Sequence, residues 1–423
     1  MTAGLPDQPA ATPAATPERA DGATGYGYDA ILLTGFGGPE GPDDVLPFLR
    51  NVTSGRGVPD ERLAEVAEHY RALGGTSPIN EQTRNLRDAV QAELVDRGIA
   101  LPVLWGNRNW HPYLAETVKA ARESGRHRLL GVTTSAYSSY SSCRQYREDF
   151  AAALLASESL GTVTIDKVRP YYDQPGFLEP FIDATVDVLR TALAARLDAD
   201  DIEVVFTTHS LPSAMADASG SATFDEHGDG GAYRRQHLAA CRAVMAGVGE
   251  QLTELPGEIR WQLAFQSRSG GPTVPWLEPD IGDALRALAA DGRRAVIVVP
   301  IGFVSDHVEV IWDLDTEAAR LAADLELSFW RVPTPGTDTR FVAGLVDLIA
   351  ERLGRGLPHA PMVELPARPE FCAAGCCVNL SGPKPTTAGQ DSVDDWTGLD
   401  VARQQLVGSG ICARPSGTGD SSR

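Results

Sequence analysis

The sequence has no excess of basic residues and very little lysine. Its 423 residues include 37 Lys and Arg against 57 Asp and Glu, which gives a formal net charge of −20. Lysine occurs only at Lys119, Lys167 and Lys384. A protein that binds nucleic acid needs a basic face for the phosphate backbone. The composition therefore argues against a nucleic-acid partner.

The sequence also lacks a long apolar run. A membrane-spanning helix needs about 18–20 consecutive apolar residues, and no stretch approaches this length. The first 25 residues carry a single base, Arg19, and lack both the basic start and the apolar core of a signal peptide. We expect residues 1–25 to be a disordered leader, and we expect a cytoplasmic protein without an integral membrane span.

Cysteine is scarce but clustered. The six cysteines are Cys143, Cys241, Cys372, Cys376, Cys377 and Cys412. Clustered cysteines in a cytoplasmic chain of this size indicate metal ligation before disulfides. Three of them share the segment FCAAGCCVN, and a Cys₄ site needs a fourth, for which Cys143 and Cys412 are the candidates. The spacing is not that of a zinc ribbon, so an iron–sulfur cluster competes with zinc, and three free thiols in a tail are the plain alternative.

Apolar runs rich in β-formers alternate with segments of helical periodicity. The expected strands are Asp29–Gly35, Leu101–Gly106, Leu129–Ser135, Val163–Val168, Ile202–Thr207, Ile259–Phe265, Ala295–Pro300 and Leu327–Val332. The expected helices are Glu61–Leu73, Glu81–Arg97, Pro112–Ser124, Phe177–Ala195, Tyr233–Leu252, Asp280–Ala290 and Phe341–Leu353. Such alternation with continuously apolar strands predicts parallel sheets covered on both faces.

The strands divide four and four around residue 200, which predicts two similar doubly wound α/β domains with a cleft between them. We expect an N-terminal domain over 26–198, a C-terminal domain over 199–355 whose last helix packs back on the first domain, and a cysteine-bearing extension over 356–423. Asp217–Gly231 resembles a mobile surface loop. Ligands of such sheets bind at the carboxyl ends of strands.

One histidine occupies such a position. In the segment FTTHSLP a buried strand delivers His209 at its carboxyl end. An imidazole there could take up protons or bind a metal near neutral pH. A histidine that only caps the strand is the structural alternative.

Three carboxylates follow another strand end, in VPIGFVSDHVEVIWDLDTE. We expect a helix that begins near Ser305, with Ser305 or Asp306 as its cap. Glu309, Asp313 and Glu317 then lie along one face and repel one another. A divalent cation would offset the repulsion, whereas the alternative is a solvated acidic face.

Three further segments carry weaker signals. The turn GGTSPIN offers the Ser77 hydroxyl and amides to an anion. The segment TTSAYSSYSSCRQY places Tyr137, Tyr140 and Tyr146 after a strand, which suits a flat, partly polar ligand; the alternative is a Ser-rich loop whose tyrosines pack on the core. GFGGPEGP contains neither a GxGxxG pattern nor a lysine, so nucleotide phosphate binding is poorly supported.

Taken together, the segments resemble ferrochelatase, the enzyme family that inserts ferrous iron into porphyrins. FTTHSLP, FQSRSGGPTVPWLEPDI and VPIGFVSDHVEVIWDLD match its most recognisable motifs in order, and GGTSPIN and WGNRNWHPY match its amino-terminal half. The likeness covers about Asp29 to Leu353. It implies two Rossmann-like halves around a porphyrin cleft.

The resemblance also implies roles for the residues after the strands. His209 corresponds to the catalytic histidine that accepts pyrrole protons and contacts the metal, and Glu309 to the carboxylate facing it across the macrocycle. Asp313 and Glu317 correspond to an acidic row that conducts or holds metal.

Other positions correspond to porphyrin contacts. Ser77 matches a residue at the propionate site, and Tyr146 a tyrosine that touches the porphyrin, with Tyr140 beside it. Phe36 stands where some members carry an iron-ligating tyrosine, a role that a phenyl ring cannot fill. His69 replaces a propionate-binding arginine, for which Arg50 or Arg56 compensates.

The cysteines resemble those of family members with a 2Fe–2S cluster, in which one ligand is mid-chain and three lie near the carboxyl end. That resemblance implies Cys143, Cys372, Cys376 and Cys377 as ligands, and Cys412 as a spare. It also implies an actinobacterial type of ferrochelatase that uses ferrous iron and coproporphyrin III and hands its product to downstream enzymes. The alternatives are protoporphyrin IX as substrate, a non-catalytic tetrapyrrole or metal carrier, and a cobalt or nickel chelatase.

Overall fold

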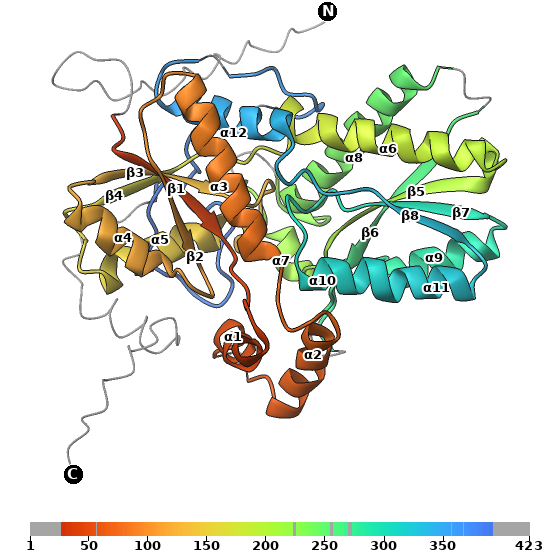
Figure 1. Cartoon of the computed structure of the whole chain (residues 1–423), viewed down its shortest axis with the longest axis horizontal. Coiled ribbons are helices and arrows are strands. Elements are labelled where there is room, and N and C mark those ends of the chain that lie inside the picture. The colour runs from red at the N-terminus through yellow and green to blue at the C-terminus, as the bar shows by residue number, and fades with distance from the viewer. Residues whose placement is uncertain are drawn as a thin grey trace, which may run out of the picture.

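The computed structural model describes residues 27–55, 57–222, 226–253, 257–269, 273–356, 358–366 and 368–391. Two four-stranded parallel sheets lie side by side (Figure 1). The first contains β1 (Ala30–Gly35), β2 (Val103–Asn107), β3 (Arg128–Thr133) and β4 (Thr164–Lys167) in the order β2-β1-β3-β4. The second contains β5 (Ile202–His209), β6 (Arg260–Gln266), β7 (Ala295–Val299) and β8 (Ser328–Arg331) in the order β6-β5-β7-β8.

The two sheets repeat one topology, which confirms the predicted pair of doubly wound α/β domains. Each predicted strand forms, because a β-branched run such as AVIVV in β7 is buried along its whole length. A strand covered on both faces needs helices on both sides, and parallel pairing supplies them through its crossovers.

The helices of the first half are α1 (Val45–Val52), α2 (Asp60–Ala72), α3 (Ile79–Asp96), α4 (Leu114–Glu123), α5 (Gln145–Ala156) and α6 (Pro175–Ala194). Those of the second half are α7 (Ser213–Asp217), α8 (Gly231–Gln251), α9 (Ile281–Ala290), α10 (Val308–Val310), α11 (Ala319–Asp324) and α12 (Thr339–Arg352). Short 3₁₀ turns occupy Pro42–Asp44 and Ala199–Asp201. Two wide π-helical segments, Tyr140–Arg144 and Ile311–Ala318, precede α5 and α11.

One apolar core joins the two sheets. It includes Leu130 and Val132 of β3 together with Val204 and Phe206 of β5. Helix α12 packs against both α6 and α3, and α6 packs against α8. In Figure 1, α12 lies above the junction of the two sheets, with α3 on one side and α6 and α8 on the other. The carboxyl ends of the strands are thereby held in fixed relation to one another.

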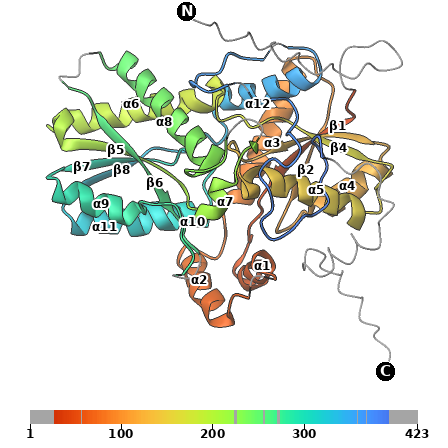
Figure 2. The ribbon, with the colours of Figure 1, turned by 180° about the vertical axis from the view of Figure 1, so that it is seen from behind.

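Helices α1 and α2 lie outside both sheets, below them in Figures 1 and 2. They form a small apolar cluster of their own around Phe48, Leu63 and Tyr70, and Val308 of α10 joins it. We call α1 and α2 the lip. The shared cluster places the lip against the segment that carries the acidic row.

The predicted start and cap of the acidic helix are wrong. The helix begins at Val308, and His307 caps it by accepting the Val310 N–H at its Nδ1 (3.3 Å). Asp306 cannot serve as the cap because both its carboxylate oxygens accept from Arg331, at 3.2 and 3.1 Å. The continuation is π-helical over Ile311–Ala318, where a regular helix was expected.

Two segments, one predicted as a surface loop and one for which a loop was the alternative, contain ordered, buried parts among the described residues. The end of the segment Thr133–Tyr146 is helical, because the Ser139 hydroxyl accepts the Ser142 N–H (3.1 Å) and starts a turn that leads into α5. In the predicted surface loop Asp217–Gly231, Ser219 and Ser221 are buried. They pack under the carboxyl-terminal extension, a contact that local sequence does not reveal.

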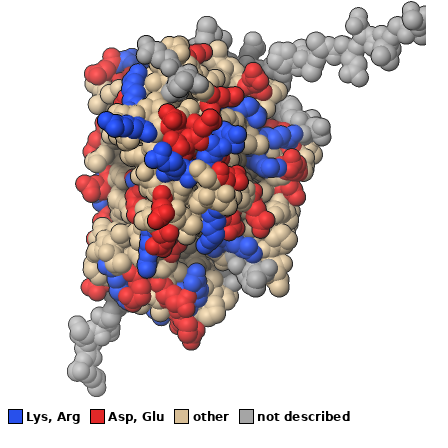
Figure 3. All heavy atoms as spheres, turned by 90° about the vertical axis from the view of Figure 1, so that its right-hand side faces the viewer, with Lys and Arg blue, Asp and Glu red and all other residues tan. Residues whose placement is uncertain are grey.

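The described residues include no membrane-spanning helix, and the face in Figure 3 does not carry charge of one sign. No helix among the described residues is long and apolar enough to cross a membrane. On the face that Figure 3 shows, acidic and basic side chains are interleaved. The expected leader over residues 1–25 and the spare Cys412 lie outside the described residues.

Candidate active site and thiol site

The topology itself marks where a ligand can bind. In each sheet the strand order reverses between the first and third strands, and the carboxyl ends flanking such a switch point are the ligand side of doubly wound sheets. His209 is the last residue of β5, and Glu309 lies on the segment after β7. In the other sheet, Phe36 follows β1 and Tyr146 follows β3. The sequence-predicted residues thus flank both switch points.

The structure brings His209 and Glu309 together. The distance from His209 Nε2 to Glu309 Oε2 is 3.8 Å, with side chains 34% and 51% exposed. His209 Nδ1 lies 2.5 Å from the Ser210 carbonyl oxygen, which can only accept a hydrogen bond. The proton of a neutral imidazole is therefore assigned to Nδ1, and the Nε2 lone pair faces Glu309.

The gap between the His209 and Glu309 side chains is narrower than a porphyrin ring, the ligand that the resemblance implies. A flat ring between two side chains needs van der Waals contact on both faces, or roughly 7 Å in all. Glu309 lies on α10 and is half exposed, so its side chain has room to rotate outward. An open pair of this kind can close on a ligand from both faces.

The groups around Glu309 are tuned by burial. Burial lowers the pKa of His307, against the opposing effect of Glu309. Burial also raises the pKa of Tyr70 on the lip, and the charge of Glu309 raises it further. Glu309 therefore adjoins two buried side chains, His307 and Tyr70, whose charged forms burial disfavours.

The rest of the acidic row is held by hydrogen bonds. Burial raises the pKa of Asp313 to about 7, although Ser267 donates a hydrogen bond that opposes the rise. Trp312 Nε1 donates to Glu317 Oε1 (2.8 Å). Beneath the row, Arg331 binds Asp315 at 2.5 Å as well as Asp306. Both the row and the opposite side of the segment are therefore anchored in the structure.

Sequence reasoning missed Arg108 in the other half of the site. Its side chain is 7% exposed and pairs with Asp149 at 2.6 Å. Its guanidinium lies 4.6 Å from the Tyr146 ring and 5.8 Å from the Phe36 ring. Of these rings Phe36 is exposed and Tyr146 is buried. The signal was available, since Arg108 comes directly after the buried end of β2.

The remaining expected porphyrin contacts lie apart from one another. Ser77 is buried, and its amide donates to Pro39 O (2.8 Å). Arg50 on the lip is 3.6 Å from Asp60 and largely exposed. The Tyr140 hydroxyl donates to Glu148 Oε2 (3.0 Å), beside the carboxyl-terminal extension. Arg56 lies outside the described residues. Their contacts with a porphyrin stay predictions.

The four clustered cysteines meet in one place, which we call the thiol site. Cys143 Sγ lies 3.7 Å from Cys372 Sγ, and Cys376 Sγ lies 3.7 Å from Cys377 Sγ. The four form a compact group. These separations are far longer than a disulfide of about 2.05 Å. Cys241 is buried in α8 and is not part of the group.

Buried cations surround the thiol site. Hydrogen bonds from Cys372 and Cys377 lower the pKa of the Cys143 thiol, and the charges of Lys167 and Arg147 assist. Lys167 is 5% exposed and Arg147 is 0% exposed. A thiolate is the form that ligates metals. The surroundings therefore favour the thiolate at Cys143 and Cys376, whereas contacts with the neighbouring thiols raise the pKa of Cys372 and Cys377.

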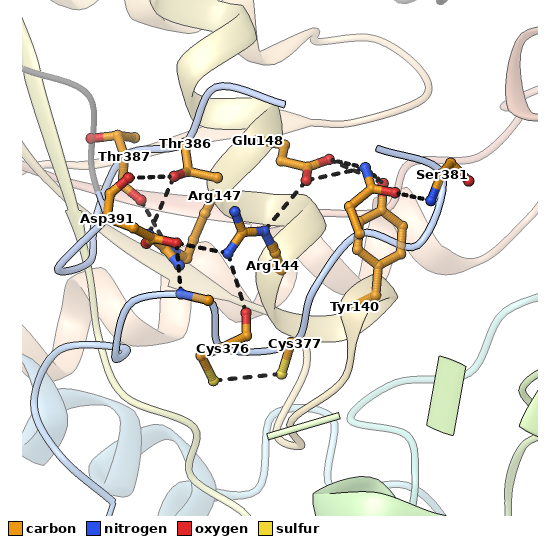
Figure 4. A network of polar contacts seen from close by, with 12 residues as sticks. Tyr140, Arg144, Arg147, Glu148, Cys376, Cys377, Ser381, Thr386, Thr387 and Asp391 are labelled. Atoms are coloured by element: carbon orange, nitrogen blue, oxygen red, sulfur yellow. Dashed lines mark hydrogen bonds and ion pairs between the residues drawn. The ribbon is translucent and has the colours of Figure 1, made fainter. Parts of the chain in front are cut away.

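The extension is fixed over this site by a carboxylate clamp (Figure 4). Asp391 Oδ2 accepts from Arg144 Nη1 (2.8 Å), and Asp391 Oδ1 accepts from Arg147. Arg147 Nε donates to the Thr387 carbonyl oxygen (2.9 Å). A side chain at Gly389 would put its Cβ 2.3 Å from the Arg147 guanidinium, so this position has no room for one.

The four thiols supply the number and kind of ligands that a Cys₄ site requires. In the ranges that the structure describes, no three or more His, Cys, Asp or Glu side chains are arranged to hold a metal ion. Two thiolates about 2.3 Å from one tetrahedral metal lie about 3.7 Å apart. The thiol site offers two such pairs, and a 2Fe–2S cluster with Cys₄ ligation takes two thiolates on each iron.

Comparison with known proteins gives consistent matches. A model of the ferrochelatase family matches residues 28–353. The coproporphyrin III ferrochelatase of Leifsonia xyli is 52% identical over 390 residues, covering 90% of this chain and 98% of that protein. That of Streptomyces coelicolor is 51% identical over 371 residues, covering 86% and 97%. Among solved structures, a sirohydrochlorin chelatase from Bacillus subtilis in complex with cobalt has a TM-score of 0.44 at 10% identity, covering 77% of this chain and 95% of that chain.

Proposed function

The chain belongs to the ferrochelatase family, and we propose that it inserts Fe²⁺ into coproporphyrin III with release of the pyrrole protons. Ferrous iron and the porphyrin are the substrates, and the product is the iron porphyrin. The observation that carries the proposal is the His209–Glu309 pair, 3.8 Å apart at a switch point between strands. Relatives of about half-identical sequence named for this activity support the choice of porphyrin.

His209 supplies the base in this proposal. A porphyrin must lose its pyrrole protons as a divalent metal enters, and a lone pair directed at the ring centre can accept them. With Nδ1 bonded to the Ser210 carbonyl oxygen, Nε2 has that lone pair. Glu309 offers an oxygen ligand from the opposite side, which suits ferrous iron as it leaves its hydration shell.

The acidic row supplies the path for iron. Glu309, Asp313 and Glu317 present oxygen ligands at successive turns of the segment that begins with α10. Asp313, with its pKa of about 7, can exchange a proton for a cation near neutral pH. Iron bound along the row would reach the ring from the Glu309 side.

The porphyrin would contact the exposed Phe36 ring, which Arg108 supports from behind. Ser77, Arg50, Tyr146 and Tyr140 remain proposed contacts for the carboxylates and edge of the macrocycle. Coproporphyrin III carries four carboxylates and protoporphyrin IX two. A site for coproporphyrin III therefore needs more cationic and hydroxyl groups in contact with the carboxylates.

An anaerobic assay of iron insertion tests the proposal directly. We expect a kcat/KM for coproporphyrin III at least tenfold above that for protoporphyrin IX. The reverse preference would make the protein a protoporphyrin ferrochelatase. Tight porphyrin binding without turnover of either substrate would support the carrier alternative and contradict the proposal.

We further propose that the thiol site holds a 2Fe–2S cluster through Cys143, Cys372, Cys376 and Cys377. The cluster would contribute charge that the buried Arg147 and Lys167 neutralise, and it would tie the extension to α5. Anaerobically purified protein should be red-brown, with visible absorption that reduction bleaches. Changing any of the four cysteines to Ser should remove the colour, and Cys241→Ala is the matched control that should keep it. Colourless protein with stoichiometric zinc would overturn the cluster while leaving the chelatase proposal intact.

A further inference from the structure

The thiol site and His209 are connected by a continuous set of hydrogen bonds. The connection starts at Cys377, whose amide donates to the Gly220 carbonyl oxygen (2.7 Å). In return the Gly220 amide donates to Cys377 Sγ (3.2 Å). Cys377 is fully buried and holds a φ of 52°, a conformation that a non-glycine residue adopts only when its surroundings impose it. The two backbones are thus locked together.

The next link runs from Gly220 to Tyr233. The hydroxyl of Ser219, the neighbour of Gly220, accepts the Tyr233 amide (2.8 Å), and the Ser219 carbonyl oxygen accepts the Ala232 amide (3.1 Å). Ser219 is 0% exposed. A shift of the Ser219–Gly220 turn would therefore move the first turn of α8.

The last link joins Tyr233 to the catalytic histidine. The Tyr233 hydroxyl donates to the His209 carbonyl oxygen (2.8 Å) and lies 2.7 Å from Thr208 Oγ1. The His209 ring is itself bonded to the backbone at Ser210. Rotation of the His209–Ser210 peptide would consequently turn the imidazole away from Glu309.

We propose that Tyr233 is a positioning residue for His209 and couples it to the thiol site through the Ser219–Gly220 turn. The proposal rests on the chelatase function and the cluster proposed above. A metal-bound thiolate accepts an N–H hydrogen bond more strongly than a thiol does. Occupation of the thiol site therefore holds Gly220, α8 and the His209 backbone in the geometry described here, and loss of the cluster releases them.

The first test reads backbone order and needs no catalysis. Hydrogen exchange is compared across the 203–212 segment in wild type, Cys143→Ser, Tyr233→Phe and the double variant. Cys143→Ser removes a cluster ligand that belongs to the first half of the chain. When Tyr233 is present, Cys143→Ser should speed hydrogen exchange of the 203–212 segment about fivefold or more, within the usual range of coupling between sites. In the Tyr233→Phe background it should add less than twofold.

The second test separates positioning from folding. Tyr233→Phe should keep the visible absorption of the cluster, lower kcat about tenfold, leave the KM for coproporphyrin III within twofold and shift the pH profile of kcat. Tyr171→Phe is the matched control, because its buried hydroxyl donates to the Thr133 carbonyl oxygen (2.8 Å) in the other sheet. It should leave kcat and its pH profile unchanged.

The outcomes are distinct. A wild-type kcat and pH profile in Tyr233→Phe, or equal effects of Cys143→Ser in both backgrounds, would overturn the coupling. Protein that inserts no iron would refute the proposed function, while the exchange experiment still decides the coupling. Wild-type protein without a cluster, with exchange unaffected by Cys143→Ser, would refute both the cluster and the coupling.

Discussion

At the scale of single residues, the site combines an imidazole nitrogen with carboxyl oxygens. His209 presents a lone pair because its other nitrogen is bonded to the backbone. Glu309 presents an oxygen 3.8 Å away. Asp313 is closer to neutrality because burial raises its pKa to about 7. One short stretch of surface thus offers both proton uptake and cation binding.

Removing either member of the facing pair should slow metal insertion by 10²-fold or more, as is typical for lost acid–base groups. We expect this for His209→Ala and for Glu309→Gln, measured as kcat in an anaerobic insertion assay. The unfolding temperature controls for stability. Folded His209→Ala protein with near-wild-type turnover would show that another group takes the pyrrole protons.

Asp313→Asn should raise the free energy of unfolding above neutral pH, and it should also raise the KM for Fe²⁺. The raised pKa means that the native state favours the protonated carboxyl, so the stability contributed by Asp313 is complete below about pH 4 and is lost as the pH rises through about 7. The variant should therefore gain up to about 4 kcal/mol over wild type at pH 8 and little at pH 4. Denaturant unfolding at both pH values measures this.

The KM values of the Asp313→Asn variant for Fe²⁺ and for the porphyrin test whether Asp313 takes part in iron delivery. Asp313→Asn should raise the KM for Fe²⁺ several-fold more than the KM for the porphyrin. Equal changes in the two values would favour a solvated acidic face without a role in iron delivery.

At the scale of elements, the lip and the acidic segment touch directly. His69 of α2 stacks on Trp312 of the π-helical segment, with ring centroids 4.2 Å apart and an interplanar angle of 9°. Trp312 in turn donates to Glu317. Val308 lies in the apolar cluster of the lip. The lip therefore closes against the residues that bracket Glu309.

His69→Ala should loosen this closure without touching the base or the acidic row. A stacked aromatic pair contributes about 0.5–1.5 kcal/mol, so the dissociation rate constant of coproporphyrin III should rise about twofold to tenfold. Stopped-flow fluorescence measures the rate. Trp312→Phe keeps a ring for stacking but loses the donor to Glu317, and it should affect the iron KM more than porphyrin release. An unchanged porphyrin release rate in His69→Ala would contradict a closing role for the stack.

At the scale of the whole molecule, the extension binds both halves. Arg144 and Arg147 of the first half bind Asp391, while Arg368 of the extension pairs with Glu226 of the second half. Cys377 adds its two hydrogen bonds to Gly220. The extension therefore links the two halves on the side of the thiol site.

Asp391→Asn should destabilise the protein by about 3 kcal/mol at pH 7, because it leaves the fully buried Arg147 without its charged partner. Burial opposes ionisation of Asp391, but the two arginines prevail and lower its pKa to about 2. The stabilisation that the ionised Asp391 carboxylate contributes is therefore present above about pH 4 and is lost as the pH falls towards 2.

Denaturant unfolding at pH 7 and near pH 3 measures the change, with the visible absorption of the thiol site as a second readout. Glu364→Gln, an exposed carboxylate in the same extension, is the matched control and should be neutral. A stable Asp391→Asn protein at pH 7 would mean that the extension is held by other contacts.

The sequence by itself determined the alternating elements and the residues at strand ends. Continuous apolar runs such as AVIVV form strands only when both faces are buried, which requires a parallel sheet, and this physical demand is local. The same logic placed His209 and the acidic row on the ligand side of the second sheet. Spacing also singled out Cys372, Cys376 and Cys377, while only the family resemblance favoured Cys143 over Cys412 as the fourth cysteine.

Only the tertiary structure decided which of these residues meet. Cys143 and Cys372 are 229 residues apart in sequence and 3.7 Å apart in space. The cap at His307, the burial of Ser219 and the pairing of Arg108 with Asp149 depend on partners far along the chain. Periodicity records which face of an element is buried but not against what. The pKa of Asp313 likewise follows from desolvation by packed neighbours, which no local pattern contains.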